Sequence, residues 1–141
     1  ADRFRTCAMA CTRASGSSFG TLLAVAFMTA AKETADQDVL SIHEIGPLIG
    51  DVNTVLMVRG RSNLGDKTAL DSLDVIRQTV QDIECPEDLH DLAFQAANEA
   101  IEAFKMKPNK IGRARMFAEK SIGLVDPGMV AVARMIGPPV G

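Results

Sequence analysis

The sequence predicts an all-α fold, an antiparallel up-and-down helical bundle or barrel formed by a single domain of 141 residues. Apolar residues recur with helical spacing over about six segments of roughly ten to eighteen residues, and short connections rich in glycine and proline join these segments. No alternation of apolar and polar residues persists as it does in strands, and no repeat of fixed length stands out.

The overall composition is that of a globular protein. Hydrophobic residues make up 47% of the chain and charged residues 23%, which is enough apolar material for a packed core. A net charge of -3 and the absence of Trp and Tyr argue against a nucleic-acid-binding protein. The three cysteines, Cys7, Cys11 and Cys85, do not have the spacing of a disulfide scaffold, which fits a reducing cytosol. Cys7 and Cys11 are four residues apart, but two thiols without a nearby His are a weak metal signal, and we interpret these two as small buried side chains.

One uncharged run, over residues 14–31, reaches the lower length limit of a membrane span. Its first five residues are small and polar, so only residues 19–31 are strongly apolar, a length that suits a buried core helix. No signal-peptide pattern is visible. We therefore expect a cytoplasmic protein without a membrane association.

The first expected helix covers residues 1–13, where Phe4, Cys7, Ala8 and Cys11 have helical spacing. No capping residue introduces this helix, so we expect that a preceding segment is absent from this sequence. A native start from which Met was removed is the alternative.

A second helix is expected over residues 19–34, and Ser15, Gly16, Ser17 and Ser18 open it. Hydroxyl groups and free backbone N–H groups at a helix start favour an anion such as phosphate. Simple helix capping explains the same residues, and spacing alone does not separate the two interpretations.

The third helix is expected over residues 42–58, because Ser41 and Glu44 form a capping box before it. Gly46 and Pro47 are expected to bend its early part. His43 in its first turn, like His90 further along the chain, is interpreted as solvated. The expected apolar face consists of Ile45, Leu48, Ile49, Val52, Val55 and Leu56.

A fourth helix, over residues 69–83, follows a polar connection over residues 59–68. Asp66, Lys67 and Thr68 at the end of this connection are interpreted as a helix cap and solvated surface. Pro86 separates the fourth helix from a fifth, which runs to about residue 104. The fourth helix buries Leu70, Leu73, Val75, Ile76 and Val80, and the alanines that allow close packing of the fifth are Ala93, Ala96, Ala97 and Ala100.

The stretch over residues 112–128 combines glycine, proline and cationic residues between two helices. Arg113 and Arg115 beside permissive glycines suit an anionic ligand, and a basic surface turn is the other interpretation. Pro127 and Gly128 begin the last helix, which continues through Met129, Val132 and Met135. In an up-and-down bundle this stretch can meet residues 15–18 and 60–68 at one end and form a site for a polyphosphate.

Three motifs in this order, the last of them in two parts, carry a family resemblance. The chain resembles the nucleotide-binding, DhaL-type subunit or domain of dihydroxyacetone kinases over nearly its whole length. The motifs are Ala14-Ser15-Gly16, Gly65-Asp66-Lys67-Thr68, Gly112-Arg113-Ala114 and Asp126-Pro127-Gly128.

The resemblance implies a barrel of antiparallel helices that holds ADP or ATP with magnesium at one end. No catalytic residue and no metal ligand is expected within this chain, because the family's metal-binding aspartates lie in a motif upstream of the first Ser-Gly loop. Matched motif by motif, the nucleotide-binding residues are Ala14, Ser15 and Gly16 at the phosphates, Gly60, Thr68 and Ala69 in the nucleotide pocket, Arg113 at the phosphates, and Asp126, Pro127 and Gly128 in the closing loop.

The activity that the resemblance implies is transfer of a phosphoryl group to dihydroxyacetone, which a partner subunit or domain holds. The nucleotide is either spent as ATP or retained as ADP and recharged by a phosphotransferase-system protein. A related small ketose is an alternative acceptor.

Two departures from the family pattern leave other functions open. The upstream metal-binding motif is absent from this chain, and Thr12 and Arg13 stand where the family usually has two glycines. A non-catalytic nucleotide-binding adapter, or a regulatory homologue, is therefore the second hypothesis, and a purely structural bundle is the third.

Overall fold

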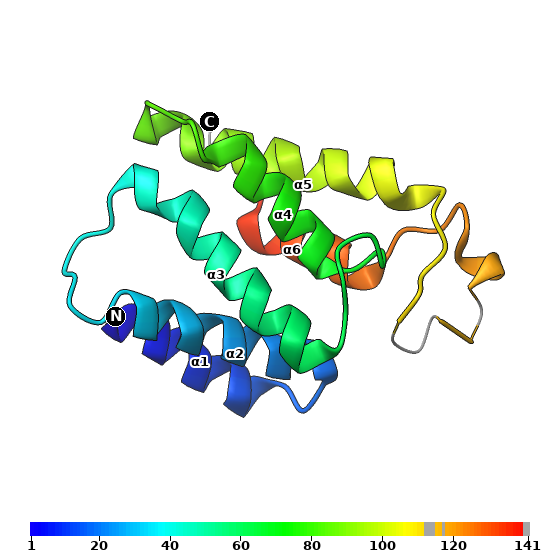
Figure 1. Cartoon of the computed structure of the whole chain (residues 1–141), viewed down its shortest axis with the longest axis horizontal. Coiled ribbons are helices and arrows are strands. Elements are labelled where there is room, and N and C mark those ends of the chain that lie inside the picture. The colour runs from blue at the N-terminus through cyan, green and yellow to red at the C-terminus, as the bar shows by residue number, and fades with distance from the viewer. Residues whose placement is uncertain (112–114, 117, 140–141) are drawn as a thin grey trace.

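The computed structural model describes residues 1–111, 115–116 and 118–139, and within them the chain is helical and without strands (Figure 1). This confirms the all-α prediction. The α-helices are α1 (Asp2–Ala14), α2 (Ser18–Glu33), α3 (Ile42–Gly60), α4 (Ala69–Val80), α5 (Leu89–Lys105) and α6 (Pro127–Ile136), and the short 3-10 helices are η1 (Pro86–Asp88) and η3 (Glu119–Ser121). None of these helices combines the length and the apolar run that crossing a membrane requires.

Neighbouring helices along the chain are also neighbours in space. The main contacts join α1 to α2, α2 to α3, α3 to α4, α4 to α5 and α5 to α6, with a further contact between α4 and α6. Successive helices run in opposite directions (Figure 1). The arrangement is the predicted antiparallel bundle, and its closure into a barrel stays a prediction.

Two apolar clusters make up the core. One joins α4, α5 and α6 through Ile76, Val80, Ala97 and Val132, which are all buried. The other joins α2, α3 and α4 through residues such as Ala30, Leu56 and Leu70. Ala96, Ala97 and Ala100 of α5 are fully buried, as predicted, so small side chains bring its neighbours close.

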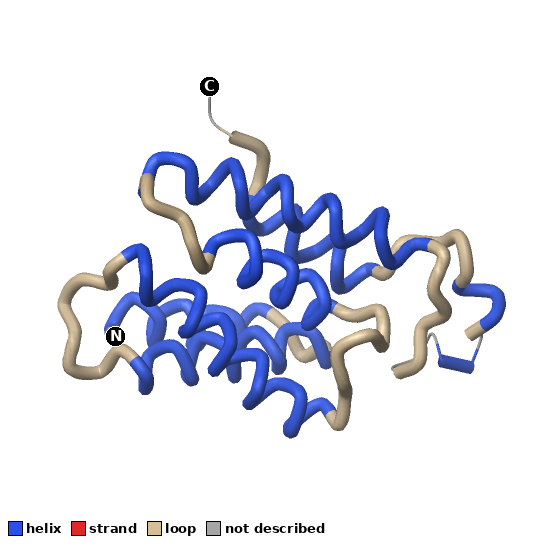
Figure 2. Tube along the Cα trace, turned by 45° about the horizontal axis from the view of Figure 1, so that its top comes forward, coloured by secondary structure: helices blue, strands red, loops and turns tan. Residues whose placement is uncertain are grey.

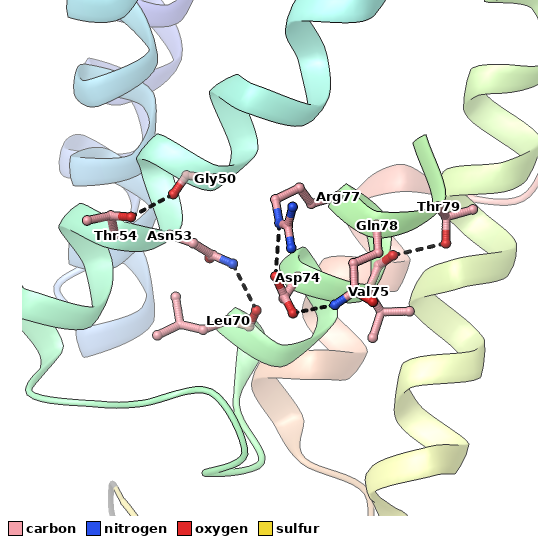
Figure 3. A network of polar contacts seen from close by, with 9 residues as sticks. All are labelled: Gly50, Asn53, Thr54, Leu70, Asp74, Val75, Arg77, Gln78 and Thr79. Carbon is pink, nitrogen blue, oxygen red and sulfur yellow. Dashed lines mark hydrogen bonds and ion pairs between the residues drawn. The ribbon is translucent and has the colours of Figure 1, made fainter. Parts of the chain in front are cut away.

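The close approach of α3 to the end of α4 depends on glycine at position 46 but not at position 50. A Cβ atom on Gly46 would lie 3.1 Å from the Cα atom of Gln81, and one on Gly50 would lie 3.4 Å from Cδ of Arg77. Asn53 donates from its Nδ2 atom to the carbonyl oxygen of Leu70 at 3.2 Å, across the same contact (Figure 3). The helix continues through Pro47 as a single element.

Several predicted core residues lie at the surface instead. Cys7 is exposed and Cys11 is half-buried, so the interpretation of these two cysteines as buried was wrong. Val55, which was expected on the apolar face of α3, is also exposed, although it has helical spacing with buried neighbours. Since helical spacing repeats around a wide face, it does not say how far the covering helix extends across it.

Three connections lie together at one end of the bundle. The turn between α1 and α2, the connection between α3 and α4 and the described residues of the connection between α5 and α6 all lie toward the right-hand ends of the helices that they join in Figure 1, and Figure 2 shows the same side of the bundle. The other two connections lie at the opposite end. We refer to the end with three connections as the loop end.

Candidate functional site

The loop end gathers the starts of α2, α4 and α6, because alternate helices of an antiparallel bundle begin at the same end (Figure 1). The first N–H groups of a helix have no partner inside the helix, and the helix dipole adds positive potential there. Among the hydrogen bonds of the described residues, none uses the backbone N–H of Ser18, Phe19, Ala69 or Gly128. These donors are the elements of an anion site.

The turn before α2 is held by its own serines. Ser17 caps the helix by accepting from the Gly20 N–H at 3.0 Å, and its hydroxyl lies 2.7 Å from that of Ser15. A Cβ atom on Gly20 would lie 2.4 Å from the Ser15 hydroxyl oxygen, so the turn requires glycine there. The hydrogen bonds among these serines show capping, and they leave the N–H groups of Ser18 and Phe19 for a ligand.

The connection before α4 is organised by a buried carboxylate. Asp71 accepts from the N–H of Thr68 at 2.7 Å and from the N–H of Gly65, while the Thr68 hydroxyl accepts from the N–H of Leu70 at 3.2 Å. The predicted cap at Thr68 is therefore confirmed. Arg61 has φ +49°, Gly65 has φ +94° and Lys67 has φ +62°, so this short connection contains three residues with positive φ.

The start of α6 lies directly beside the start of α4. Asp126 caps α6 by accepting from the N–H of Met129 at 3.0 Å. A Cβ atom on Gly128 would lie 3.5 Å from both the backbone nitrogen and the Cβ atom of Ala69. The unpaired N–H groups of Ala69 and Gly128 thus belong to adjacent helix starts, and glycine keeps the space between them open.

Lys67 is a residue whose role the sequence interpretation missed. Its side chain is 0% exposed, whereas the sequence predicted solvated surface. The ammonium group donates to three backbone carbonyl oxygens, those of Lys105 at 3.0 Å, Lys107 at 2.8 Å and Ser121 at 2.9 Å. Burial lowers the pKa of Lys67 from its ordinary value of 10.5, and the negative charge of Asp126 acts in the opposite direction.

Two more buried polar residues connect the α3–α4 and α5–α6 connections. Asn109 donates through its Nδ2 atom to the carbonyl oxygen of Lys67 at 2.9 Å and to Asp126 at 3.0 Å, and its own N–H donates to the hydroxyl of Ser121 at 2.8 Å. Asp66 accepts from the N–H of Asn63 at 2.8 Å, and its carbonyl oxygen accepts from the N–H of Lys110 at 3.2 Å. It is 7% exposed, so its interpretation as solvated surface was wrong. The only local signal for these partners was the polar character of the two connections.

The structure brings some of the predicted site residues into contact and leaves others further apart. Ala69 and Gly128 are adjacent, whereas Ser15 lines a groove of about 620 Å³ that also includes Thr12 and Arg59. Arg113 lies outside the described residues. Ser15, Thr68, Ala69, Asp126 and Gly128 are half-buried, and Ala14, Gly16, Gly60 and Pro127 are exposed.

The described residues do not supply a magnesium site by themselves. No group of three or more His, Cys, Asp or Glu side chains gathers among them in a way that could hold a metal ion. The carboxylates of the loop end are engaged by backbone N–H groups, at Asp66, Asp71 and Asp126 alike. The chemistry that the chain's own groups support is therefore binding of an anion by backbone donors.

Comparison with known proteins identifies a family that the chain matches. Residues 1–137 match the DAK2 domain family. The chain is 32% identical over 128 residues to the "PEP-dependent dihydroxyacetone kinase, ADP-binding subunit DhaL" of Escherichia coli (strain K12), a match that covers 87% of this chain and 59% of that protein.

A second relative is the "PEP-dependent dihydroxyacetone kinase 1, ADP-binding subunit DhaL" of Listeria innocua serovar 6a. Its identity with the chain is 26% over 132 residues, which covers 94% of this chain and 63% of the relative. The chain thus spans about three fifths of the length of these curated relatives. The resemblance to DhaL-type subunits is confirmed, and because the family match covers nearly all of the sequence, the chain belongs to the DAK2 domain family.

Proposed function

We propose that this chain is the nucleotide-binding part of a dihydroxyacetone-type kinase and that it holds the phosphates of ADP or ATP at the loop end. The observation that carries the proposal is the meeting of two helix starts, where a Cβ atom on Gly128 would lie 3.5 Å from the Ala69 nitrogen and no hydrogen bond of the described residues uses the N–H of Ala69 or Gly128. Converging helix starts bind phosphate through their N–H groups and their dipoles. Both relatives are named as ADP-binding subunits, which supports the same ligand.

Each motif has a distinct role in this proposal. The starts of α2, α4 and α6 supply backbone donors to the phosphates, and the capping residues Ser17, Thr68 and Asp126 hold those starts in place. Arg113 adds a guanidinium group toward the phosphates. The bound nucleotide supplies the phosphoryl group, and the chain's own residues bind and orient it.

Partner proteins hold the acceptor and recharge the nucleotide. The phosphoryl group passes to a hydroxyl group of dihydroxyacetone, or of a related small ketose, held on a partner subunit or domain. The names of the relatives contain "PEP-dependent", which supports retention of ADP and its recharging by a phosphotransferase-system protein. Magnesium ligands are expected from residues outside this chain.

The test is a titration of the chain with ADP, followed through the backbone amide signals of the protein in NMR spectra. We expect saturable shifts at Ala69 and Gly128 with a Kd of about 1 mM or tighter. The variant Gly128→Ala places a methyl group 3.5 Å from the Ala69 nitrogen and 3.0 Å from Oδ1 of Asp126, the cap of α6, so ADP should bind at least about tenfold more weakly.

The matched control is Gly50→Ala. Gly50 lies inside α3, where an added Cβ meets only the flexible Cδ atom of Arg77, so ADP affinity should stay unchanged. Absence of ADP binding by the unmodified chain, or equal binding by Gly128→Ala, would overturn the proposal.

A further inference from the structure

A single ammonium group holds both ends of the segment that connects α5 to η3. The Nζ atom of Lys67 donates to the carbonyl oxygens of Lys105 and Lys107 at the beginning of this segment and to that of Ser121 at its end. The N–H of Gly123 donates to the same carbonyl of Lys105 at 2.9 Å. The two ends of the segment therefore meet at Lys67, which lies between α3 and α4 in the sequence.

A continuous series of contacts runs from this lysine to the start of α6. The carbonyl oxygen of Lys67 accepts from Asn109, and Asn109 also donates to one carboxylate oxygen of Asp126. The other carboxylate oxygen of Asp126 caps α6 at Met129. Since Thr68, the cap of α4, follows Lys67 directly, the position of the α6 start relative to the α4 start is fixed through these residues.

A buried charged side chain fills space at a higher cost in free energy than an apolar side chain. Moving an ammonium group out of water costs free energy that its hydrogen bonds must offset, and an apolar side chain of similar volume often gives equal stability. The ammonium group adds directional hydrogen bonds, because it donates to three carbonyl oxygens at short distances in one geometry. The lysine thus specifies where the segment ends lie more than it raises stability.

We propose that Lys67 is a positioning residue of the nucleotide site, which holds the start of α6 beside the start of α4 by binding both ends of the segment between Lys105 and Ser121. This inference rests on the proposed function, since the donors that it positions are those of Ala69 and Gly128. Lys67 itself does not reach the ligand, because its three donor positions are used by backbone carbonyls.

The experiment compares Lys67→Met with the control Lys105→Met. Methionine keeps the length of the side chain but not its donors. The control also removes one positive charge, but the Lys105 side chain lies near the surface beside Glu102, and the carbonyl group that Lys67 uses remains. We expect the Kd for ADP to rise at least about tenfold in Lys67→Met and to stay unchanged in Lys105→Met.

Hydrogen exchange of the same variants without ADP reports the contact directly. In Lys67→Met the N–H groups of Gly123 and Asn109 should exchange faster, because their acceptors are no longer held, while the amides of α1 to α3 keep their wild-type rates. If Lys67→Met does not fold, Asn109→Ala removes the next contact of the series and should give the same two changes at smaller amplitude.

The outcomes separate the two proposals. A lower melting temperature with unchanged ADP affinity would show that Lys67 is only structural and would overturn the inference. Absence of ADP binding by the unmodified chain contradicts the proposed function instead, and faster exchange at Gly123 in Lys67→Met would then still establish Lys67 as the residue that holds the segment.

Discussion

At the scale of single residues, folding moves the Lys67 ammonium group from water into a buried site. It is enclosed by backbone carbonyl groups and lies near the carboxylate of Asp126. Burial lowers its pKa in the folded chain, whereas in the unfolded chain the group keeps its ordinary value of 10.5. Between these two values the unfolded chain binds more protons than the folded chain.

This difference predicts how stability depends on pH. The free energy of unfolding rises with pH wherever the unfolded state binds more protons, so Lys67 should contribute a rise as pH increases from its lowered pKa toward 10.5. Urea denaturation of the unmodified chain and of Lys67→Met at several alkaline pH values measures the contribution as a difference. A difference that stays flat or falls with pH over this range would show that the pKa of Lys67 is not lowered.

At the scale of the elements, the turn between α1 and α2 makes a second prediction. A Cβ atom on Gly20 would lie 2.4 Å from Oγ and 2.5 Å from Cβ of Ser15, so Gly20→Ala forces the turn to move. Overpacking of this kind costs about 1 to 3 kcal/mol, which exceeds the gain of roughly 0.5 to 1 kcal/mol that alanine brings inside a helix.

The control for this prediction is again Gly50→Ala. Its added Cβ meets only a flexible side-chain atom at 3.4 Å, so the helical preference of alanine should dominate and stabilise the chain by about 0.5 kcal/mol. Thermal unfolding of both variants measures the contrast. Equal changes in melting temperature would mean that the Ser15 turn rearranges without cost.

The elements also show what the sequence could and could not predict. Caps are local, so Ser41, Thr68 and Asp126 could be placed at or near helix starts from a few neighbouring residues. The burial of Lys67 depends on carbonyl groups about forty to fifty residues further along the chain, which no local pattern contains. Cys7 was misplaced for a similar reason, since its exposure depends on how far α2 covers α1.

At the scale of the whole molecule, the up-and-down order of the helices determines where the site lies. Alternation of direction places every second helix start at the same end, so the three motifs could be expected to meet once the number of helices was known (Figure 2). The packing of the helices against one another decides which helix starts are in contact. The contact between α4 and α6 brings Ala69 to Gly128, and it follows from the apolar faces that these helices share.

A series of ligands tests whether the loop end recognises a diphosphate as a whole. A ligand that binds only the folded chain stabilises it by RT ln(1 + [L]/Kd), about 2.7 kcal/mol at one hundred times the Kd. Because the donors described here are backbone N–H groups at helix starts, the anionic part of the ligand should supply most of the binding. Pyrophosphate and ADP should therefore both raise the melting temperature, whereas adenosine at the same concentration should not. Both increases should shrink in Gly128→Ala and in concentrated salt, which screens the charges. A shift with adenosine equal to that with ADP would place recognition in an apolar pocket for the base and away from the helix starts.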